Sequence, residues 1–318
     1  MTKPTSIQFP DHQRYLNYNQ LVKTEFTERI QKISINAGFT CPNRDGSKGR
    51  GGCTYCNNQS FSPEYCKPVK TVSQQVEEGI NFFKHKYQAQ YYLAYFQSYT
   101  NTYDSLDKLK AIYDEALAHP QVKGIVVGTR PDCVSDELLD YFAELAKRVY
   151  VMIEYGIEST NGRTLEFINR GHDFACAEEA IRATAARGIR TGAHLILGLP
   201  TETRGEILDH ARKISPLPLT AIKLHQLQLV KGTEMALQFQ EHPEWFQLYT
   251  ADEYIDLAID FLELLNPEIA IERFVSQSPK NMLIAPDWGL KNFEFTAKIE
   301  KRLKQRNTWQ GKKYTPNS

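Results

Sequence analysis

Three cysteines in the first fifth of the chain have a spacing that could bind a metal. Cys41, Cys53 and Cys56 form the pattern C-x11-C-x2-C. Cysteine thiolates suit a soft metal ion or an iron–sulfur cluster. Glycines at positions 46, 49, 51 and 52 lie between the first two cysteines, and residues without a Cβ let a backbone fold around a bulky group. The pattern therefore predicts a metal-binding loop.

The number of ligands leaves two interpretations open. A structural zinc site is closed and four-coordinate, so it would also need Cys66, in the pattern C-x11-C-x2-C-x9-C. A four-iron cluster held by three cysteines would instead leave one iron open for a substrate. Tyr55 stands directly before the third cysteine, and an apolar run that predicts a strand precedes the loop. Both features favour the cluster over zinc.

The elements that must position this loop alternate along the chain. Apolar runs are typical of parallel strands buried on both faces, and apolar residues at helical spacing lie between them. We expect strands at 32–37, 91–96, 124–128, 149–154, 191–197 and 221–227, helices at 72–86, 106–117, 136–147, 176–187, 206–214 and 254–265, and a last strand at 269–274. Six βα units predict an α/β fold, an incomplete (β/α)6 TIM-type barrel with its working residues at the carboxyl ends of the strands.

The chain divides into three predicted parts. Residues 1–31 form an N-terminal lead-in, with Tyr15, Tyr18 and Phe26 as anchors onto the barrel; residues 32–265 form the barrel; residues 266–318 form a C-terminal extension. The last 28 residues carry eight Lys or Arg against two Glu, a net charge of +6, so the rest carries −6. This basic tail could contact an RNA backbone, or it could be an ordinary solvated helix face.

Composition excludes several classes of protein. The 318 residues are 41% hydrophobic and 24% charged, which is ordinary for a globular protein. The first 20 residues are polar and broken by prolines, so we expect no signal peptide. No apolar run reaches the roughly 20 residues of a membrane helix. Six irregularly spaced cysteines do not predict a disulfide framework. We expect a cytoplasmic protein with no membrane association.

The loop resembles that of a known superfamily. A three-cysteine loop after the first strand, with an aromatic residue before its last cysteine, resembles the radical S-adenosylmethionine (SAM) superfamily. The longer string from Asn36 to Asn57 is similar to one subgroup, the YtqA/YhcC-type proteins, related to the elongator-like and coproporphyrinogen-oxidase-like branches. The resemblance implies a [4Fe–4S] cluster on the three cysteines, with SAM bound to the open iron. Such enzymes cleave SAM and use a 5′-deoxyadenosyl radical to remove hydrogen from a substrate.

The resemblance runs over nearly the whole chain, and it also implies which residues bind SAM. Glu158 and Ser159 would contact the nucleoside, Arg170 the methionine carboxylate, Ile196 and Gly198 the adenine, and Tyr55 would pack on the iron-bound ligand. Gln97 and Ser98 stand where many members carry Gly-Gly-Glu for the methionine amino group. Two positions depart from the adenine element: His194 replaces a glycine, and Glu202 comes one position late.

Two further pairs are candidates for handling the substrate. Arg130 and Asp132 resemble an Arg-Pro-Asp string of the elongator-like branch; they could bind substrate or simply brace their loop. Lys223 and His225 lie two residues apart and therefore on one face of a strand. If that face lines the barrel interior, both side chains point at the substrate, since burying such groups without a task is costly.

The resemblance implies maturation of the wobble uridine of tRNA, in which a carboxymethylaminomethyl side chain is shortened to aminomethyl. The implied partners are tRNA, a reductant protein such as flavodoxin or ferredoxin, and a downstream methyltransferase. Two alternatives remain open. One is oxidation of a porphyrinogen side chain, as in the coproporphyrinogen-oxidase-like branch. The other is a non-catalytic RNA-binding protein that carries an iron–sulfur cluster or zinc.

Overall fold

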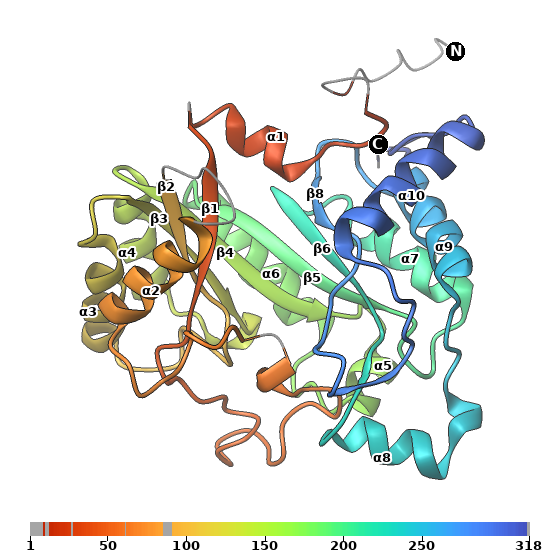
Figure 1. Cartoon of the computed structure of the whole chain (residues 1–318), viewed down its shortest axis with the longest axis horizontal. Helices are drawn as coiled ribbons and strands as arrows, with labels where there is room; N and C mark the ends of the chain where they lie inside the picture. Colours follow the sequence, from red (N-terminus) through yellow and green to blue (C-terminus); the bar gives the residue numbers. More distant parts are fainter. Residues whose placement is uncertain (1–8, 10–12, 27, 61, 85–90, 317–318) are drawn as a thin grey trace.

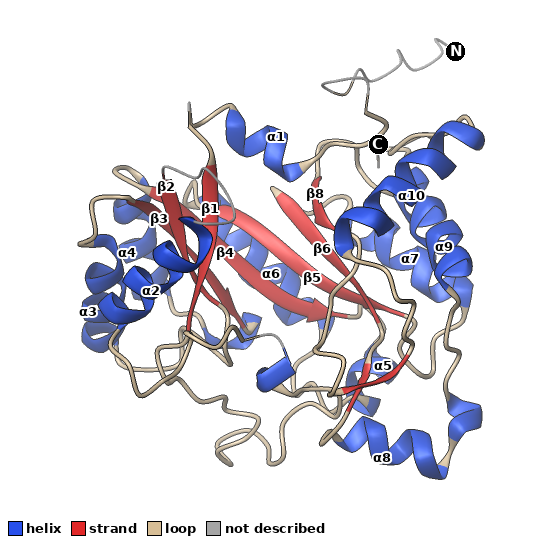
Figure 2. Ribbon diagram, viewed as in Figure 1, coloured by secondary structure: helices blue, strands red, loops and turns tan. Residues whose placement is uncertain are grey.

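A curved sheet of seven parallel strands forms the wall of a partial barrel (Figures 1 and 2). The computed structural model describes residues 9, 13–26, 28–60, 62–84 and 91–316. The sheet order is β1-β2-β3-β4-β5-β6-β8. The strands are β1 (Ile30–Ile35), β2 (Tyr91–Phe96), β3 (Val122–Thr129), β4 (Tyr150–Glu158), β5 (Arg190–Leu197), β6 (Ala221–Gln226) and β8 (Ala270–Arg273). The predicted fold class, an incomplete TIM-type barrel, is confirmed.

Helices cover the outer face of the sheet, and shorter elements lie at its two ends. The outer helices are α2 (Val72–Lys84), α3 (Leu106–Leu117), α4 (Asp136–Ala146), α6 (Phe174–Ala186), α7 (Arg204–Ile214), α9 (Ala251–Leu264) and α10 (Asn292–Gln305). The shorter elements are α1 (Tyr18–Lys23), α5 (Gly162–Phe167), α8 (Glu234–Glu241) and the antiparallel pair β7 (Leu229–Val230) and β9 (Leu283–Ala285). Across the described residues, no helix combines the length and apolar character needed to cross a membrane.

Most predicted elements occur where the sequence placed them, with small shifts. β1 begins and ends two residues earlier than predicted, and β8 joins the sheet as a seventh strand. The predicted helix at 72–86 extends to Lys84, and its last two positions lie outside the described residues. The sequence analysis missed α1, α5, α8, β7 and β9, all of which are short and therefore show too few periods of an apolar pattern.

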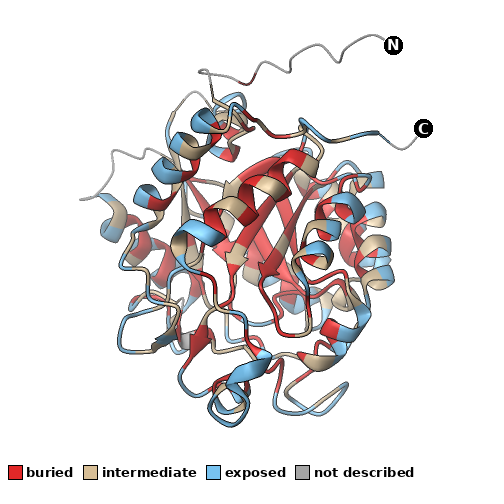
Figure 3. Cartoon of the chain, turned by 90° about the vertical axis from the view of Figure 1, so that its right-hand side faces the viewer, coloured by how far each residue is buried: buried red, intermediate tan, exposed pale blue. Residues whose placement is uncertain are grey.

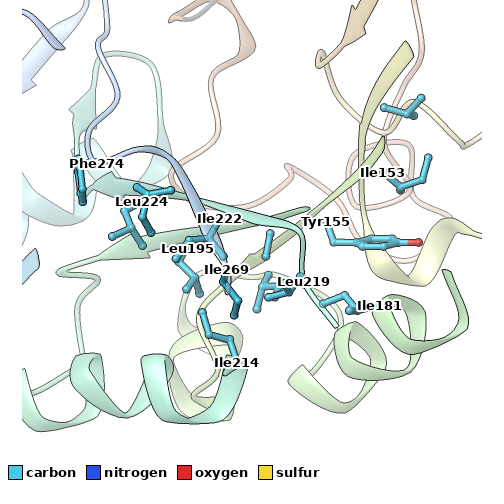
Figure 4. Close-up of a cluster of buried hydrophobic side chains, with 14 of the residues drawn as sticks. Ile153, Tyr155, Ile181, Leu195, Ile214, Leu219, Ile222, Leu224, Ile269 and Phe274 are labelled. Atoms are coloured by element: carbon cyan, nitrogen blue, oxygen red, sulfur yellow. The ribbon is translucent and has the colours of Figure 1, made fainter. Parts of the chain in front are cut away.

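The main core lies between the sheet and the outer helices. Figure 4 shows Ile153 and Tyr155 of β4 and Leu195 of β5 facing the helical layer that carries Ile181 and Ile214. Alternate residues of each strand point to this side, and each large side chain fully buried here contributes about 1.5–3 kcal/mol. Figure 3 shows the same division, with buried strands inside and helices whose outer faces are exposed.

The amino-terminal end of the barrel interior is closed by an apolar floor. The floor consists of Leu93, Val126, Tyr150, Met152, Ala221 and Ala270 from the strands, with Tyr18 and Val22 of α1 packed beneath them. The hydroxyl groups of Tyr18 and Tyr150 lie 2.8 Å apart, so α1 is fixed by a hydrogen bond as well as by packing. Tyr18, which was predicted to anchor the lead-in, therefore helps to close the amino-terminal end of the barrel interior.

The C-terminal extension is fastened to α9 and to the lead-in. Arg302 and Arg306 of α10 bind Asp256 and Asp260 of α9 at 2.6 and 2.5 Å. The backbone N–H of Gln310 donates to the Arg14 carbonyl at 2.8 Å. Residues 307–310 thus lie at the α1 end of the barrel, opposite the loop of residues 41–56 (Figure 1). Part of the basic tail is therefore neutralised within the chain.

A β-bulge shapes the last strand of the sheet. Ile222 pairs with Ile271, and the next residue, Lys223, pairs with Arg273. Glu272 is therefore an extra residue in β8. A bulge of this kind re-aims the side chains that follow it, so Arg273 comes to the same side of the sheet as its partner Lys223.

Gly124 in β3 is expected to tolerate no side chain. A Cβ at this position would lie 2.1 Å from the Tyr150 carbonyl oxygen of β4, and the paired backbone cannot rotate away. Gly124→Ala should lower the free energy of unfolding in urea by about 3 kcal/mol. The control is Gly162→Ala, where a Cβ meets nothing within 4 Å; it should change that free energy by less than about 1 kcal/mol. Equal effects at the two glycines would contradict the β3–β4 register.

Candidate functional site

The loop of residues 41–56, here called the cysteine loop, lies at the carboxyl end of the barrel (Figure 1). Its glycines permit a fold that side chains would block. A Cβ on Gly49 would lie 2.2 Å from Asn43 Oδ1, and one on Gly52, whose φ is +86°, would lie 2.7 Å from Arg44 Nε. The N–H of Gly52 donates to the Asn43 carbonyl at 2.8 Å. The loop thus wraps closely over Asn43 and Arg44.

Side-chain donors surround the cysteine sulfurs. Asn43 Nδ2 lies 3.7 Å from Cys53 Sγ and Arg170 Nη1 lies 3.5 Å from the same atom, while Asn58 Nδ2 lies 3.8 Å from Cys56 Sγ. N–H groups directed at thiolate sulfur stabilise its charge and tune a bound iron–sulfur cluster. The donors to Cys53 and Cys56 therefore suit thiolates that bind a cluster.

Cys66 lies apart from this arrangement. It is buried, and burial raises the pKa of its thiol to about 12. Within the described ranges, no three Cys, His, Asp or Glu side chains are grouped as ligands of a single metal ion. The charges of Cys53 and Cys41 act on the pKa of Cys56, whereas burial alone acts on that of Cys66, so Cys66 stands outside the group of three.

Arg170 links the cysteine loop to the end of β4. Its guanidinium donates to the Gly156 carbonyl at 2.5 Å and lies 3.9 Å from Glu158 Oε1, while its Nε is buried without a hydrogen-bond partner. Glu158 adopts a left-handed φ of 68°, a strained conformation that clusters at functional sites. Arg170, Glu158 and Tyr55 thus come together beside Cys53, and their roles in binding the methionine and nucleoside parts of SAM stay predictions.

Glu202, which the sequence analysis left unassigned, holds Ser159. The Ser159 hydroxyl donates to Glu202 Oε1 at 2.5 Å, and His210 Nε2 of α7 lies 3.2 Å from the same oxygen. All three side chains are buried. Through these two contacts, Glu202 positions the residue that follows β4 against α7.

The remaining residues predicted for SAM lie along the same rim. Ile196 packs in an apolar cluster that Tyr55 borders. Gly198 has a φ of +93°, and a Cβ there would lie 3.2 Å from the Tyr249 ring, so only glycine fits. Gln97 donates to Ser34 Oγ at 3.0 Å, and Ser98 is buried with its Oγ 3.4 Å from Ser62 Oγ. The roles of these four residues in cofactor binding stay predictions.

Arg130 and Asp132 bind each other and brace their loop, which is one of the two roles that the sequence left open. Arg130 Nε and Nη2 lie 2.9 and 3.0 Å from the two carboxylate oxygens, and Lys48 Nζ of the cysteine loop lies 2.7 Å from Asp132. Burial would raise the pKa of Asp132, but these hydrogen bonds hold it well below its ordinary value. Arg130 Nη1 remains buried without a partner, so the brace still has one donor for a ligand.

Lys223 and His225 do point into the barrel. Lys223 Nζ lies 2.5 Å from Glu154 Oε2 of β4 and 3.0 Å from the Tyr95 hydroxyl of β2, across the interior. Lys32 of β1 joins Glu154 at 2.9 Å and Glu272 of β8 at 2.7 Å. His194 Nε2 lies 3.0 Å from Glu154 Oε2. We call the charged and imidazole side chains of this group the interior charge layer; its members are Lys32, Glu154, His194, Lys223 and Glu272.

The interior charge layer lies directly above the apolar floor. Burial lowers the pKa of Lys223 to about 8, so the lysine is still protonated at neutral pH and pairs with Glu154. His225 stands next to the layer, its ring centroid 5.5 Å from that of His194, and its Nε2 is buried without a partner. Lys223 is thus engaged by its neighbours, whereas His225 is available to a ligand.

Family comparisons agree with this geometry. The family model described as the Radical SAM superfamily matches residues 38–214, and a second model, the Radical_SAM C-terminal domain, matches residues 219–305. Among curated proteins, YtqA of Bacillus subtilis is 34% identical over 94% of this chain and 92% of its own length. MJ0486 of Methanocaldococcus jannaschii is 36% identical over 94% of this chain and 92% of its own length.

Solved structures share the fold at low sequence identity. The archaeal Methanocaldococcus infernus Elp3 with an N-terminal deletion superposes with a TM-score of 0.67 and 13% identity; the match covers 88% of this chain but 64% of that one. Streptococcus suis SuiB bound to S-adenosylmethionine gives a TM-score of 0.50 and 10% identity over 81% of this chain and 54% of its own. These two likenesses support the fold alone.

Removal of the Glu154 carboxylate should destabilise the barrel strongly. Glu154→Ala leaves the ammonium groups of Lys32 and Lys223 short of a partner in the interior, and loss of one member of a buried ion pair costs about 3–5 kcal/mol. The matched control is Glu178→Ala, which breaks an exposed pair with Arg182 on α6 and should cost less than about 0.5 kcal/mol. Urea unfolding measures both; similar losses would show that the interior charge layer carries little stability.

Proposed function

Because the chain belongs to the radical SAM superfamily, we propose that it is an enzyme that removes hydrogen from a modified wobble uridine in tRNA. The proposed reaction shortens a carboxymethylaminomethyl side chain to aminomethyl. Loss of hydrogen and of a second electron from the carbon between the amine and the carboxylate would give an imine, with SAM as the oxidant that ends as methionine and 5′-deoxyadenosine. Water would then hydrolyse the imine, so that the aminomethyl group stays on the uridine and the two-carbon fragment leaves as glyoxylate. Membership of the superfamily supports the reaction type. The choice of substrate is supported by the subgroup resemblance of the cysteine loop and by the chemistry of the barrel mouth.

The cofactors of the superfamily are a [4Fe–4S] cluster and SAM, and the chain uses both. Cys41, Cys53 and Cys56 would hold the cluster, and Arg170 with its free Nε would meet the anionic end of SAM. When bound, the pair supplies a carbon radical strong enough to break an unactivated C–H bond. The protein's own residues must orient the substrate and keep water and side reactions away.

The residues at the mouth are arranged for positioning. Glu202 fixes Ser159, and the brace of Arg130 and Asp132 ties the cysteine loop to the end of β3 through Lys48. Below them, the floor that α1 seals keeps solvent from entering at the other end of the barrel. We therefore expect substrate to approach from the carboxyl ends of the strands, where the cysteine loop lies.

One observation carries the proposal of an RNA substrate. Tyr99 is 39% exposed beside the cysteine loop, and the guanidinium carbon of Arg44 lies 5.7 Å from its ring centroid. Lys48 and Arg50 of the same loop add exposed positive charge. An exposed aromatic ring among cations suits a splayed base and its phosphates. We therefore base the RNA contact on the mouth, since residues 307–310 of the tail lie at the opposite end of the barrel.

The proposed partners follow from the reaction. A reductant protein such as flavodoxin or ferredoxin would supply the electron, and a downstream methyltransferase would use the aminomethyl product. The tRNA substrate is the partner that experiment can test first.

The cysteine assignment predicts a clear difference between variants. Alanine at Cys41, Cys53 or Cys56 should abolish stable iron binding after anaerobic reconstitution and stop formation of 5′-deoxyadenosine under a strong reductant. Cys66→Ala is the matched control and should retain both, because Cys66 is buried away from the other three. Iron retained in a Cys53→Ala variant, or lost in Cys66→Ala, would overturn the ligand assignment.

The substrate proposal predicts a change in cellular tRNA. In cells that lack the gene, total tRNA should accumulate carboxymethylaminomethyl uridine and lose the aminomethyl form and its methylated product. Mass spectrometry of tRNA nucleosides measures all three. Complementation with a Cys53→Ala variant serves as the control and should not restore the products. Identical profiles with and without the gene would exclude this tRNA reaction and direct the search to a small molecule such as a porphyrinogen.

A further inference from the structure

The barrel interior contains one cation that no carboxylate neutralises. Glu154 already accepts from Lys32, Lys223 and His194, and Glu272 is bound by the same two lysines. For the side chain of Arg273, the structure shows neither a hydrogen bond nor an ion pair within its described part, and its Nε is buried without a partner. Three cations therefore face two carboxylates.

The neighbouring groups do not remove this excess charge. Burial lowers the pKa of His194 and of His225, so both rings are neutral at neutral pH. Glu158, the next carboxylate towards the mouth, lies 3.9 Å from Arg170 and is matched by it. An uncompensated cation in a barrel interior is costly. The excess positive charge is therefore a feature that a bound anion would relieve.

The bulge in β8 directs Arg273 into the barrel. It pairs with Lys223, which faces inward, and its charge acts on the pKa of Tyr95, Lys223 and His225. The space around it is accessible: the side chains of Glu272 and His194 are 17% and 18% exposed although they lie inside the barrel. A small anionic group could therefore reach Arg273 from the mouth.

We propose that Arg273 and His225 form a subsite for the carboxylate of the substrate. The guanidinium offers N–H donors in a planar fork that matches a carboxylate, and the unpartnered Nε2 of His225 stands beside it to complete the contact. The inference rests on the proposed function, whose uridine side chain ends in such a carboxylate. It assigns the part of the substrate that the enzyme recognises and later removes.

The two lysines and two glutamates of the interior charge layer neutralise one another, which leaves Arg273 free to bind an anion. Their mutual pairing leaves no free carboxylate to occupy Arg273 and no free ammonium to compete for the anion. A substrate whose side chain has already lost the carboxylate would leave Arg273 unpaired again. The subsite thus favours binding of the carboxylated form over the product.

The test uses the anaerobically reconstituted enzyme and two RNAs. Both are anticodon stem-loops; the wobble side chain carries a carboxymethylaminomethyl group in one and the corresponding amide in the other. Conversion to the amide should reduce kcat/KM of the wild-type enzyme on the order of a hundredfold. Arg273→Gln should reduce kcat/KM for the acid by a similar factor and abolish the discrimination between acid and amide. Arg273→Lys should restore part of it.

Controls separate recognition of the substrate from other roles. Arg182→Gln, on the exposed face of α6, should behave as wild type, and Arg273→Gln should bind SAM with unchanged affinity. Because Arg273 has no partner to lose, Arg273→Gln should unfold at no lower urea concentration than wild type. Weaker SAM binding would assign Arg273 to the cofactor, and a large loss of stability would assign it a structural role; either result overturns the subsite.

Two further outcomes distinguish this inference from the proposed function. If the wild-type enzyme converts the acid and the amide equally well, the carboxylate subsite is wrong while the tRNA reaction stands. If the wild-type enzyme neither binds nor converts the carboxylated RNA, the proposed function fails and the subsite, which rests on it, fails with it.

Discussion

The structure depends on one buried carboxylate in the middle of the barrel. Glu154 lies at the centre of β4, is 1% exposed, and accepts hydrogen bonds from Lys32 of β1, His194 of β5 and Lys223 of β6. Since Lys32 also reaches Glu272 on β8, the two edge strands of the open sheet are joined by charge where no backbone hydrogen bonds join them. Ion pairs thus connect β1 and β8, which are not paired as neighbouring strands.

This layer divides the interior into two regions with different tasks. Beneath it, tyrosine and aliphatic side chains pack against α1 and exclude water. Above it, the side chains are polar, partly accessible and incompletely paired, as Arg170 Nε, Arg130 Nη1 and His225 Nε2 show. Buried donors without partners are rare in proteins. These three atoms lie on the side of the cysteine loop, where a ligand could supply the partner that each of them lacks.

The sequence predicted the barrel because its strands are long apolar runs and its helices have a regular period. The spacing of the three cysteines within one loop was also enough to predict a metal-binding loop, and their role as ligands stays a prediction. The sequence did not predict the interior charge layer. In the sequence, Glu154 and Glu272 are each a single acidic residue near the end of an apolar run, and only the fold places them next to Lys32 and Lys223. Arg273 was not predicted for a different reason: simple alternation from Ile271 would turn its side chain outward, and the bulge reverses that.

The bulge also has a consequence for how specificity can change. The direction of Arg273 depends on the number of residues in β8 and not on a particular neighbour. Loss of a single residue from this strand would restore plain alternation and move the guanidinium to the helical side, with every other strand unaltered. A related chain could therefore exchange one substrate for another by a change in strand length, while an alignment of its residues still showed the arginine.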